Sequence, residues 1–235
     1  MKLSRLLGEA AAGGHGDLDI AGVTADSRDV GNGYAFFAVP GHAGDGLAYV
    51  ADARARGARV IVAPREADVG LPLVVVPDVR AALAHAAAAM CPRQPELVAA
   101  VTGTSGKSSV VDFLRQIWIA LGREAASLGT IGVVDKNGAQ YGALTTPGPV
   151  ALHQTLDALA ARGVTHLAME ASSLGVDQRR LVGVRLALGA FTNFSRDHLD
   201  HHRDLEEYFA AKMRLFDTLL QPGQTAVIDA DSSVA

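Results

Sequence analysis

The stretch Leu97-Val98-Ala99-Ala100-Val101-Thr102-Gly103-Thr104-Ser105-Gly106-Lys107-Ser108-Ser109 decides the fold of this chain. Its first part, residues 97–102, is an apolar run that predicts a buried strand. The glycine-bearing turn leads into a segment that predicts an amphipathic helix over about residues 108–121. A strand, a glycine-containing loop with Lys-Ser and a helix, in that order, are typical of a phosphate-binding loop.

The chemistry of such a loop explains its residues. Backbone N–H groups at the helix N-terminus point at the ligand, and the helix dipole favours negative charge. Gly103 and Gly106 let the backbone approach phosphate oxygens. Lys107 would pair with the β and γ phosphates, and the Ser108 hydroxyl would bind Mg²⁺. Val101 stands where the full pattern has glycine, so an ordinary strand-to-helix turn is the alternative.

Outward from this loop, strand-like and helix-like runs alternate, which predicts an α/β architecture. Most of the strands are apolar throughout, as in a mostly parallel sheet that is covered on both faces. Pro92 and Pro95 interrupt the alternation and predict a boundary between a small α/β domain, residues 1–93, and a second domain that contains the phosphate loop, residues 94–235. The other expected strands are 34–39, 59–63, 73–76, 165–170, 186–192 and 225–229, and the other expected helices are 47–56, 79–90, 150–161 and 205–219.

The composition is that of an ordinary globular protein, with 49% hydrophobic and 20% charged residues. A net charge of -4 argues against a nucleic-acid or anionic-membrane binder. The single cysteine, Cys91, excludes an internal disulfide. No segment reads as a signal peptide or membrane span, so we expect a soluble cytoplasmic protein. The oligomeric state is left open.

Lys212 occupies an unusual position for a lysine. The helix around it carries an apolar stripe, and Lys212 follows Tyr208 by four residues and precedes Leu215 by three, which places it on that stripe. One interpretation is snorkelling, with the ammonium reaching water past its neighbours. The other is a partly buried functional lysine. The stripe comprises Leu205, Tyr208, Phe209, Leu215 and Phe216.

Polar groups gather where predicted strands end, which is where α/β sheets place their ligand-binding residues. Glu170 ends one strand, and its carboxylate is suited to Mg²⁺, although a solvated acid is the alternative. A cluster of His198, His201 and His202 follows another strand. Its spacing matches no zinc site. We therefore expect one histidine with a site role and two solvated ones.

With these motifs in order, the chain resembles the Mur ligases, and within that family the MurE type that adds the third amino acid to UDP-MurNAc-L-Ala-D-Glu. The resemblance covers nearly the whole chain. Its most specific run is Phe191-Thr192-Asn193-Phe194-Ser195-Arg196-Asp197-His198-Leu199-Asp200. The other matching motifs are Asp26-Ser27-Arg28, residues 36–46, residues 102–109, Thr145-Thr146-Pro147, Glu170-Ala171-Ser172-Ser173 with Gln178 and Arg180, and Tyr208-Phe209-Ala210-Ala211-Lys212.

The resemblance implies a role for each matching residue. It implies an N-terminal domain that binds UDP-MurNAc and a central domain that binds ATP and Mg²⁺, with a free amino acid as the third substrate. Lys212 would be carbamylated by CO₂, which requires a neutral amine, and burial in an apolar setting favours that form. The implied catalytic residues are Lys107, Glu170, His198 and Lys212; the metal ligands are Ser108, Glu170, His198 and Lys212; the ATP contacts are Gly103, Thr104, Ser105, Gly106, Lys107, Ser108 and Ser109; the substrate contacts are Ala25, Ser27, His42, Ala43, Gly44, Thr145, Thr146, Ser172, Gln178 and Arg180.

The chain also departs from the family pattern. Ser105 stands where asparagine is usual, and Leu174 stands where a histidine is frequent. The family has a third, C-terminal domain that would bind the incoming amino acid, and this sequence stops before it. We therefore expect a fragment that ligates poorly alone. The residues that would select the added amino acid are expected in that third domain. The alternatives are a non-catalytic nucleotide-binding module and a sister ligase of the MurF or folylpolyglutamate synthase type.

Overall fold

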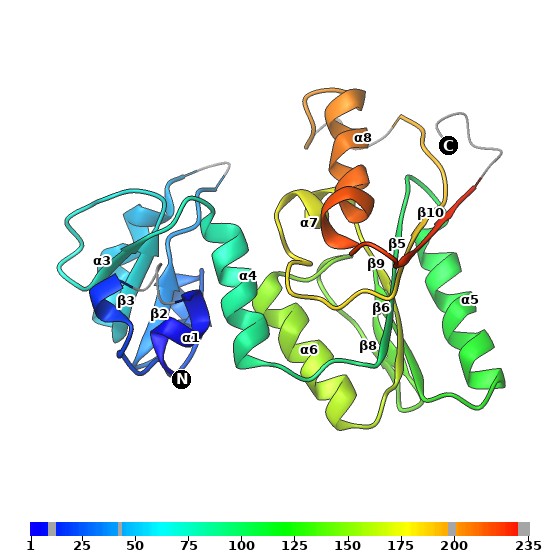
Figure 1. The fold of residues 1–235 in the computed structure, drawn as a ribbon, viewed down its shortest axis with the longest axis horizontal. Helices are drawn as coiled ribbons and strands as arrows, with labels where there is room; N and C mark the ends of the chain where they lie inside the picture. Colours follow the sequence, from blue (N-terminus) through cyan, green and yellow to red (C-terminus); the bar gives the residue numbers. More distant parts are fainter. Residues whose placement is uncertain (9–12, 42–43, 197–200, 230–235) are drawn as a thin grey trace. The chain divides into compact units, whose positions relative to one another are not determined.

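The computed structural model describes residues 1–8, 13–41, 44–196 and 201–229. The chain divides into two compact units, Met1–Pro92 and Arg93–Ala235 (Figure 1). Each unit has its own sheet, and each is described by itself.

In the described part of the first unit, the strands form a parallel sheet of four, in the order β1-β2-β3-β4. Phe36 and Ile61, on two central strands, are fully buried in its core. The predicted helix over residues 47–56 is divided, because Asp45 caps a 3-10 turn over Gly46–Tyr49 before the α-helix begins. The elements are α1 (Leu3–Leu7), β1 (Val23–Thr24), β2 (Tyr34–Phe37), α3 (Val50–Ala55), β3 (Ala58–Ala63), β4 (Leu73–Val75) and α4 (Val79–Met90).

In the described part of the second unit, a sheet of seven strands has the order β11-β10-β5-β9-β6-β7-β8. All neighbouring pairs are parallel except β6 with β7 and β7 with β8. The predicted mostly parallel α/β fold is therefore confirmed. The strands are β5 (Leu97–Thr102), β6 (Ala125–Gly129), β7 (Gly132–Asp135), β8 (Gly138–Gln140), β9 (His166–Glu170), β10 (Leu188–Phe191) and β11 (Thr225–Ile228), and the helices are α5 (Lys107–Ala120), α6 (Pro149–Ala161), α7 (Ser173–Asp177) and α8 (Leu205–Arg214).

Helices cover both faces of this sheet, as the all-apolar strands predicted (Figure 1). On β9, Leu167 and Met169 point to one face, where they pack with Leu156 of α6. Ala168 points to the opposite face and packs with Val111 of α5. Because successive strand residues point to opposite faces, a run that is buried on both sides must be apolar at every position.

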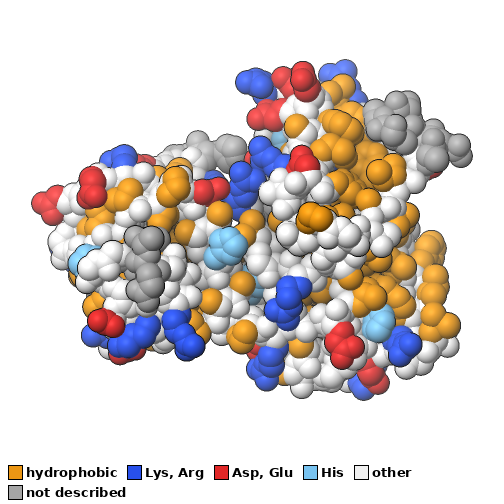
Figure 2. Space-filling model, in the orientation of Figure 1, with side chains coloured by type: hydrophobic (Ala, Val, Ile, Leu, Met, Phe, Trp, Pro, Cys, Tyr) orange, Lys and Arg blue, Asp and Glu red, His pale blue; other side chains and the backbone are white. Residues whose placement is uncertain are grey.

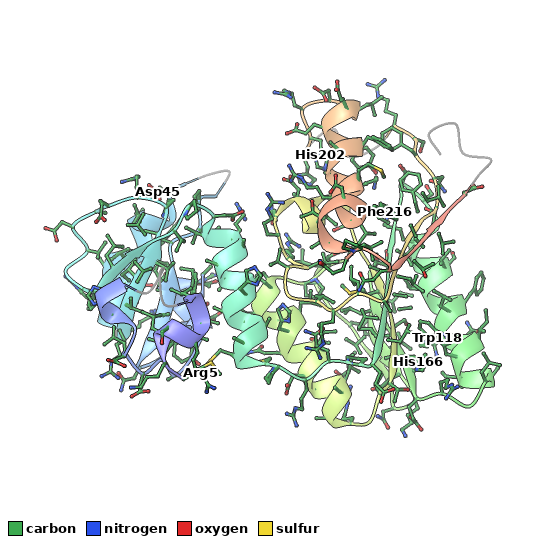
Figure 3. All side chains as sticks on the ribbon, in the orientation of Figure 1. Arg5, Asp45, Trp118, His166, His202 and Phe216 are labelled. Atoms are coloured by element: carbon green, nitrogen blue, oxygen red, sulfur yellow. The ribbon has the colours of Figure 1, made fainter. Side chains whose placement is uncertain are left out.

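The register of the central strands brings their carboxyl ends together. Val101 of β5 pairs with Glu170 at the end of β9, and Thr102 pairs with Phe191 at the end of β10. The loops that follow these strands therefore emerge side by side at one edge of the sheet. His166, at the other end of β9, stacks edge-to-face on Trp118 with ring centroids 5.2 Å apart (Figure 3).

Several elements were not predicted from the sequence: α1, β1, β6, β7, β8 and α7. The strand β6, Ala-Ala-Ser-Leu-Gly, lacks β-branched and aromatic residues, and β7 and β8 extend it as an antiparallel ladder. The predicted helix over residues 205–219 is α-helical to Arg214 and then continues as a π-helical turn, Leu215–Leu219.

Phe113 and Ile117 of α5 are exposed, and hydrophobic side chains gather over this helix in Figure 2.

Candidate functional site

The phosphate-loop candidate is the turn between β5 and α5. Gly103 has φ +139, and a Cβ at this position would lie 2.0 Å from the Thr192 Oγ1 atom. Gly106 has φ +83 and forms the N-cap of α5. Glycine is therefore required at Gly103 by both close approach and backbone conformation, and at Gly106 by conformation alone.

The loop after β10 holds this turn in shape. Thr104 donates its backbone N–H to the Asn193 carbonyl at 2.9 Å, and Ser105 donates its backbone N–H to the Asn193 Oδ1 atom at 3.0 Å. The Asn193 amide donates in return to the Ser105 carbonyl at 3.1 Å. Asn193 was not predicted as a site residue, although its run was singled out as the most specific motif. Its signal was its place directly after a buried strand.

Lys107 folds back onto the turn. Its Nζ atom donates to the Gly103 carbonyl at 3.0 Å and to the Thr104 carbonyl at 2.9 Å. The ammonium therefore lies within the turn, and its pairing with phosphate stays a prediction.

Glu170 lies at the end of β9 and is 2% exposed. Its Oε1 atom accepts the Ser108 hydroxyl at 2.9 Å and the Thr130 backbone N–H at 2.8 Å. Gly129 makes room for this carboxylate, since a Cβ there would lie 2.1 Å from the Glu170 Oε1 atom. The solvated strand-end acid is therefore wrong for Glu170. Thr130 and Gly129 were missed, because β6 was not predicted.

Lys212 is 1% exposed, so the snorkelling interpretation is wrong. Its Nζ atom donates to the Gly103 carbonyl at 2.7 Å and lies 4.2 Å from the centroid of the Tyr208 ring. The Tyr208 hydroxyl donates to the Thr104 Oγ1 atom at 3.3 Å. Thus α8 delivers the lysine to the phosphate-loop turn. Leu205 departs from the predicted apolar stripe: it is 40% exposed, because it is the first residue of α8.

Most of the predicted substrate contacts in the second unit are joined by hydrogen bonds around Thr146. Thr146 is fully buried, and its hydroxyl donates to the Glu170 carbonyl at 3.0 Å and bonds with the Ser172 hydroxyl at 3.0 Å. Arg180 donates to the Thr146 carbonyl at 2.6 Å and to the Gln178 Oε1 atom at 2.7 Å. The network fixes the first turn of α7 against the carboxyl end of β9.

These groups meet at one cavity of about 410 Å³. Its walls are formed by residues of the turn between β5 and α5 and by residues next to α7. Its lining residues are Thr104, Gly106, Lys107, Ser108, Thr130, Leu144, Thr145, Thr146, Glu170, Ser172, Ser173, Leu174, Arg180, His201 and Lys212. Among the predicted residues of the described part of this unit, Gly103, Ser105, Ser109 and Gln178 do not line it. Gly103 and Ser105 hold the turn, and Gln178 holds Arg180.

The remaining predicted substrate residues belong to the first unit. Ser27 is buried, and its hydrogen bond to Asp52 is the largest cause that lowers the pKa of that carboxyl. Ala25 and Gly44 are exposed. His42 and Ala43 lie outside the described residues. The roles of these residues remain predictions.

The histidine cluster differs from the expectation. His198 lies outside the described residues, and His201 lines the cavity. His202 is 4% exposed rather than solvated, and burial lowers its pKa. It lies beside α8 on the side of α7 (Figure 3). The sequence could not show that His202 is buried while His201 is exposed, because residues in a loop do not alternate between buried and exposed at a regular spacing.

The donor set suits a hard cation more than a zinc ion. Among the described residues, no group of three or more His, Cys, Asp or Glu side chains could hold a metal ion. Ser108 and Glu170 nevertheless present adjacent oxygen atoms at the cavity. Mg²⁺ keeps several waters and needs only one or two protein oxygens, so these two residues fit it.

Comparison with known proteins identifies the type of chain. Residues 101–235 match the profile of the Mur ligase middle domain, and residues 19–117 match that of the Mur ligase family, catalytic domain. The UDP-N-acetylmuramoyl-L-alanyl-D-glutamate–2,6-diaminopimelate ligase of Brucella melitensis is 52% identical over 98% of this chain and 48% of its own length. The same-named ligase of Mesorhizobium japonicum is 53% identical over 98% of this chain and 49% of its own length.

Solved structures agree with the sequence comparison. A UDP-N-acetylmuramoyl-L-alanyl-D-glutamate–2,6-diaminopimelate ligase superposes with a TM-score of 0.84 at 28% identity, covering 99% of this chain and 48% of its own. A MurF of Acinetobacter baumannii, at 23% identity and a TM-score of 0.60, covers 91% of this chain and 44% of its own and shares the fold. The chain thus spans about half the length of the curated relatives it matches. No helix in the described part is long and apolar enough to cross a membrane.

Proposed function

This chain belongs to the Mur ligase family, and we propose that it forms the ATP-binding and acceptor-binding part of a ligase that joins 2,6-diaminopimelate to UDP-MurNAc-L-Ala-D-Glu. The names of its relatives support the acceptor and the amino acid. The sister-ligase alternative has weaker support, since the MurF structures share less of the sequence. Such a ligase would act in peptidoglycan precursor synthesis, in the cytoplasm.

One observation carries this proposal. A single cavity is lined by the phosphate-loop side chains Lys107 and Ser108, by the buried carboxylate Glu170 and by Arg180 beside α7. A ligase of this kind must bring a phosphoryl donor and a carboxylate acceptor within reacting distance. A module that only bound a nucleotide would need the first group of residues but not the last.

The phosphate-loop side would bind ATP. The backbone N–H groups at the start of α5 and the Lys107 ammonium supply positive potential for the phosphates. Lys107 now donates to two loop carbonyls, and we expect it to exchange these for phosphate oxygens. Gly103 to Ser109 would surround the triphosphate, with Ser105 and Gly103 fixing the shape of the turn.

Ser108 and Glu170 would hold Mg²⁺ through their adjacent oxygens, which are now joined by a hydrogen bond of 2.9 Å. When bound, the ion would neutralise charge on the phosphate oxygens. Thr130 keeps the Glu170 carboxylate in place through its backbone N–H. His198 remains a proposed further ligand.

Lys212 would carry a carbamate. The ammonium would first lose one proton; the neutral amine would then add to CO₂ and lose a second, so a carbamate anion would replace a cation at the edge of the cavity. A carbamate nitrogen keeps one N–H, which could still donate to the Gly103 carbonyl as the Nζ atom does at 2.7 Å. Burial of Lys212 favours the neutral amine that this reaction needs.

The acceptor side would orient a carboxylate. Arg180 presents a guanidinium braced by Gln178 and by the Thr146 carbonyl. Ser172 and Thr145 lie on the same cavity. A carboxylate oxygen of the bound acceptor would attack the γ-phosphorus of ATP, with ADP leaving. The amine nitrogen of the amino acid would then attack the acyl phosphate carbon, phosphate would leave, and the amine would lose a proton as the amide forms. Catalysis would come from positioning and charge neutralisation.

Calorimetry with Mg·AMP-PNP and thermal shift with the acceptor test this function. We expect Lys107→Met and Glu170→Gln to weaken nucleotide binding at least about tenfold. Lys136→Met, on an exposed lysine, is the matched control and should bind as the wild type does. UDP-MurNAc-L-Ala-D-Glu should raise the Tm, and Arg180→Met should abolish that rise. Wild-type protein that binds no nucleotide would refute the proposal, and stabilisation by UDP-MurNAc-tripeptide instead would refute the assigned acceptor.

A further inference from the structure

His202 is a buried titratable group to which the proposed reaction gives no task. Its Nε2 atom and the Ser173 hydroxyl form a hydrogen bond of 3.0 Å. Both residues are 4% exposed. Ser173 is the first residue of α7, and His202 lies in the segment that leads into α8, so this bond joins the start of α7 to that segment across 29 residues of the chain.

The His202 ring also reaches the phosphate loop through one aromatic neighbour. It packs on the Tyr208 ring with centroids 5.3 Å apart. The same Tyr208 ring lies 4.2 Å from the Lys212 Nζ atom, and its hydroxyl donates to the Thr104 Oγ1 atom at 3.3 Å. A displacement of the His202 ring would therefore move the surface on which Lys212 rests.

A second contact, between α7 and α8 themselves, also holds the two helices together. Arg214 of α8 forms an ion pair with Asp177 of α7. That pair is partly exposed, so screening weakens it. The His202–Ser173 bond joins two side chains that are each 4% exposed, so it competes little with water.

We propose that His202 is a positioning residue that, through Ser173 and the Tyr208 ring, holds Lys212 against the phosphate-loop turn. This inference rests on the proposed function for its consequence, the binding of nucleotide. Its structural claim, that one histidine fixes the first turn of α7 and the Gly103–Thr104 turn together, does not depend on any ligand.

Amide hydrogen exchange with three variants tests the structural claim. His202→Phe keeps an aromatic ring but loses the bond to Ser173, Ser173→Ala loses the bond while the ring stays, and His202→Gln can restore a bond at the Nε2 position. We expect the first two to speed exchange of the amides of residues 104–105 and 175–176 at least about tenfold. His202→Gln should exchange as the wild type does, and amides of β3 should not change. The His202→Phe/Ser173→Ala double variant should be no faster than either single variant, since both remove one interaction.

Nucleotide affinity provides the second readout. His202→Phe and Ser173→Ala should each raise the Kd for Mg·AMP-PNP about tenfold, whereas His85→Gln, on an exposed histidine, should leave it unchanged. If both variants exchange and bind within twofold of the wild type, His202 is not a positioning residue. If the wild type binds no AMP-PNP, the proposed function fails, and the exchange rates still decide this inference. If His202→Phe does not fold, Ser173→Ala alone decides it.

Discussion

Gly129→Ala should show whether stability and nucleotide binding depend on the space that Gly129 leaves for the Glu170 carboxylate. Gly129 is the last residue of β6, and its φ lies outside the left-handed region. Alanine is therefore allowed by the backbone at this position. The added Cβ would lie 2.1 Å from the Glu170 Oε1 atom and 2.6 Å from its Cδ atom. Ordinary van der Waals contact begins at 3.4 Å, so the carboxylate must move by at least about 1 Å.

That movement would break the bonds that hold the carboxylate. The Ser108 hydroxyl and the Thr130 N–H are 2.9 Å and 2.8 Å from the Oε1 atom, and a shift of that size takes both beyond hydrogen-bond distance. Hydrogen bonds to a charged group contribute about 1.5–3 kcal/mol each. Because the side chain can swing into the adjacent cavity and regain water, we expect a net loss of about 1–3 kcal/mol in the free energy of unfolding.

Urea unfolding and calorimetry with Mg·AMP-PNP measure the two consequences of Gly129→Ala. We expect the loss of stability above and at least about a tenfold weaker affinity, since the displaced carboxylate no longer faces Ser108. Gly148→Ala is the matched control, because nothing lies within 4 Å of its Cβ position; as an N-cap it should change stability by less than about 1 kcal/mol. A Gly129→Ala protein with wild-type stability and wild-type affinity would refute the assignment of Glu170 to the nucleotide site.

Three further outcomes follow from the structure. Burial lowers the pKa of His202 below 6.5, so as the pH falls the unfolded chain is protonated before the folded one. The contribution to stability is therefore full above about pH 6.5 and is lost below it. His202→Gln should make the Tm depend less on pH between about pH 7.5 and 5.5. A Tm of the wild type that is as flat as the variant's would contradict this. Arg93 lowers the pKa of Asp157 below 3.8, so the contribution of the pair is present above that pH; Asp157→Asn should lose about 0.5–1 kcal/mol in urea unfolding at pH 7 and less at about pH 3.5. An equal loss at both pH values would show that the ion pair is not the cause. A carbon-13 NMR spectrum in labelled bicarbonate should show a carbamate signal that Lys136→Met keeps and Lys212→Met lacks; a signal in both variants, or in neither, would exclude the carbamate at Lys212.

Much of the fold could be predicted because its strongest signals are local. Residues 97–102 and 79–90 were predicted with the bounds that the structure shows, since an apolar strand run and a helix capped by Asp78 depend mainly on neighbouring residues. The segments that were missed depend on partners elsewhere in the chain. Ala125–Gly129 becomes a strand because it pairs with β9, and Ser173–Asp177 becomes a helix because Thr146 and Ser172 hold its first turn.

The candidate site divides in the same way. Lys107, Glu170 and Lys212 could be selected from the sequence, because a lysine on an apolar stripe and an acid at a strand end are local anomalies. Asn193 was marked only by its place after a predicted strand and Thr130 by no signal, because each acts through a bond to a residue far along the chain. The task of His202 was hidden for the same reason.

The sequence by itself determined the class of fold, the phosphate loop and the family resemblance, because each depends on the order and spacing of residues along the chain. Only the tertiary structure decided that Lys212 is buried against Gly103 rather than snorkelling. Only it joined Glu170 to Ser108 across 62 residues and turned His202 into the core. The physical reason is that burial and hydrogen bonding of a side chain depend on which strands are neighbours in the sheet, and strand order is a property of the assembled sheet, which no single segment carries.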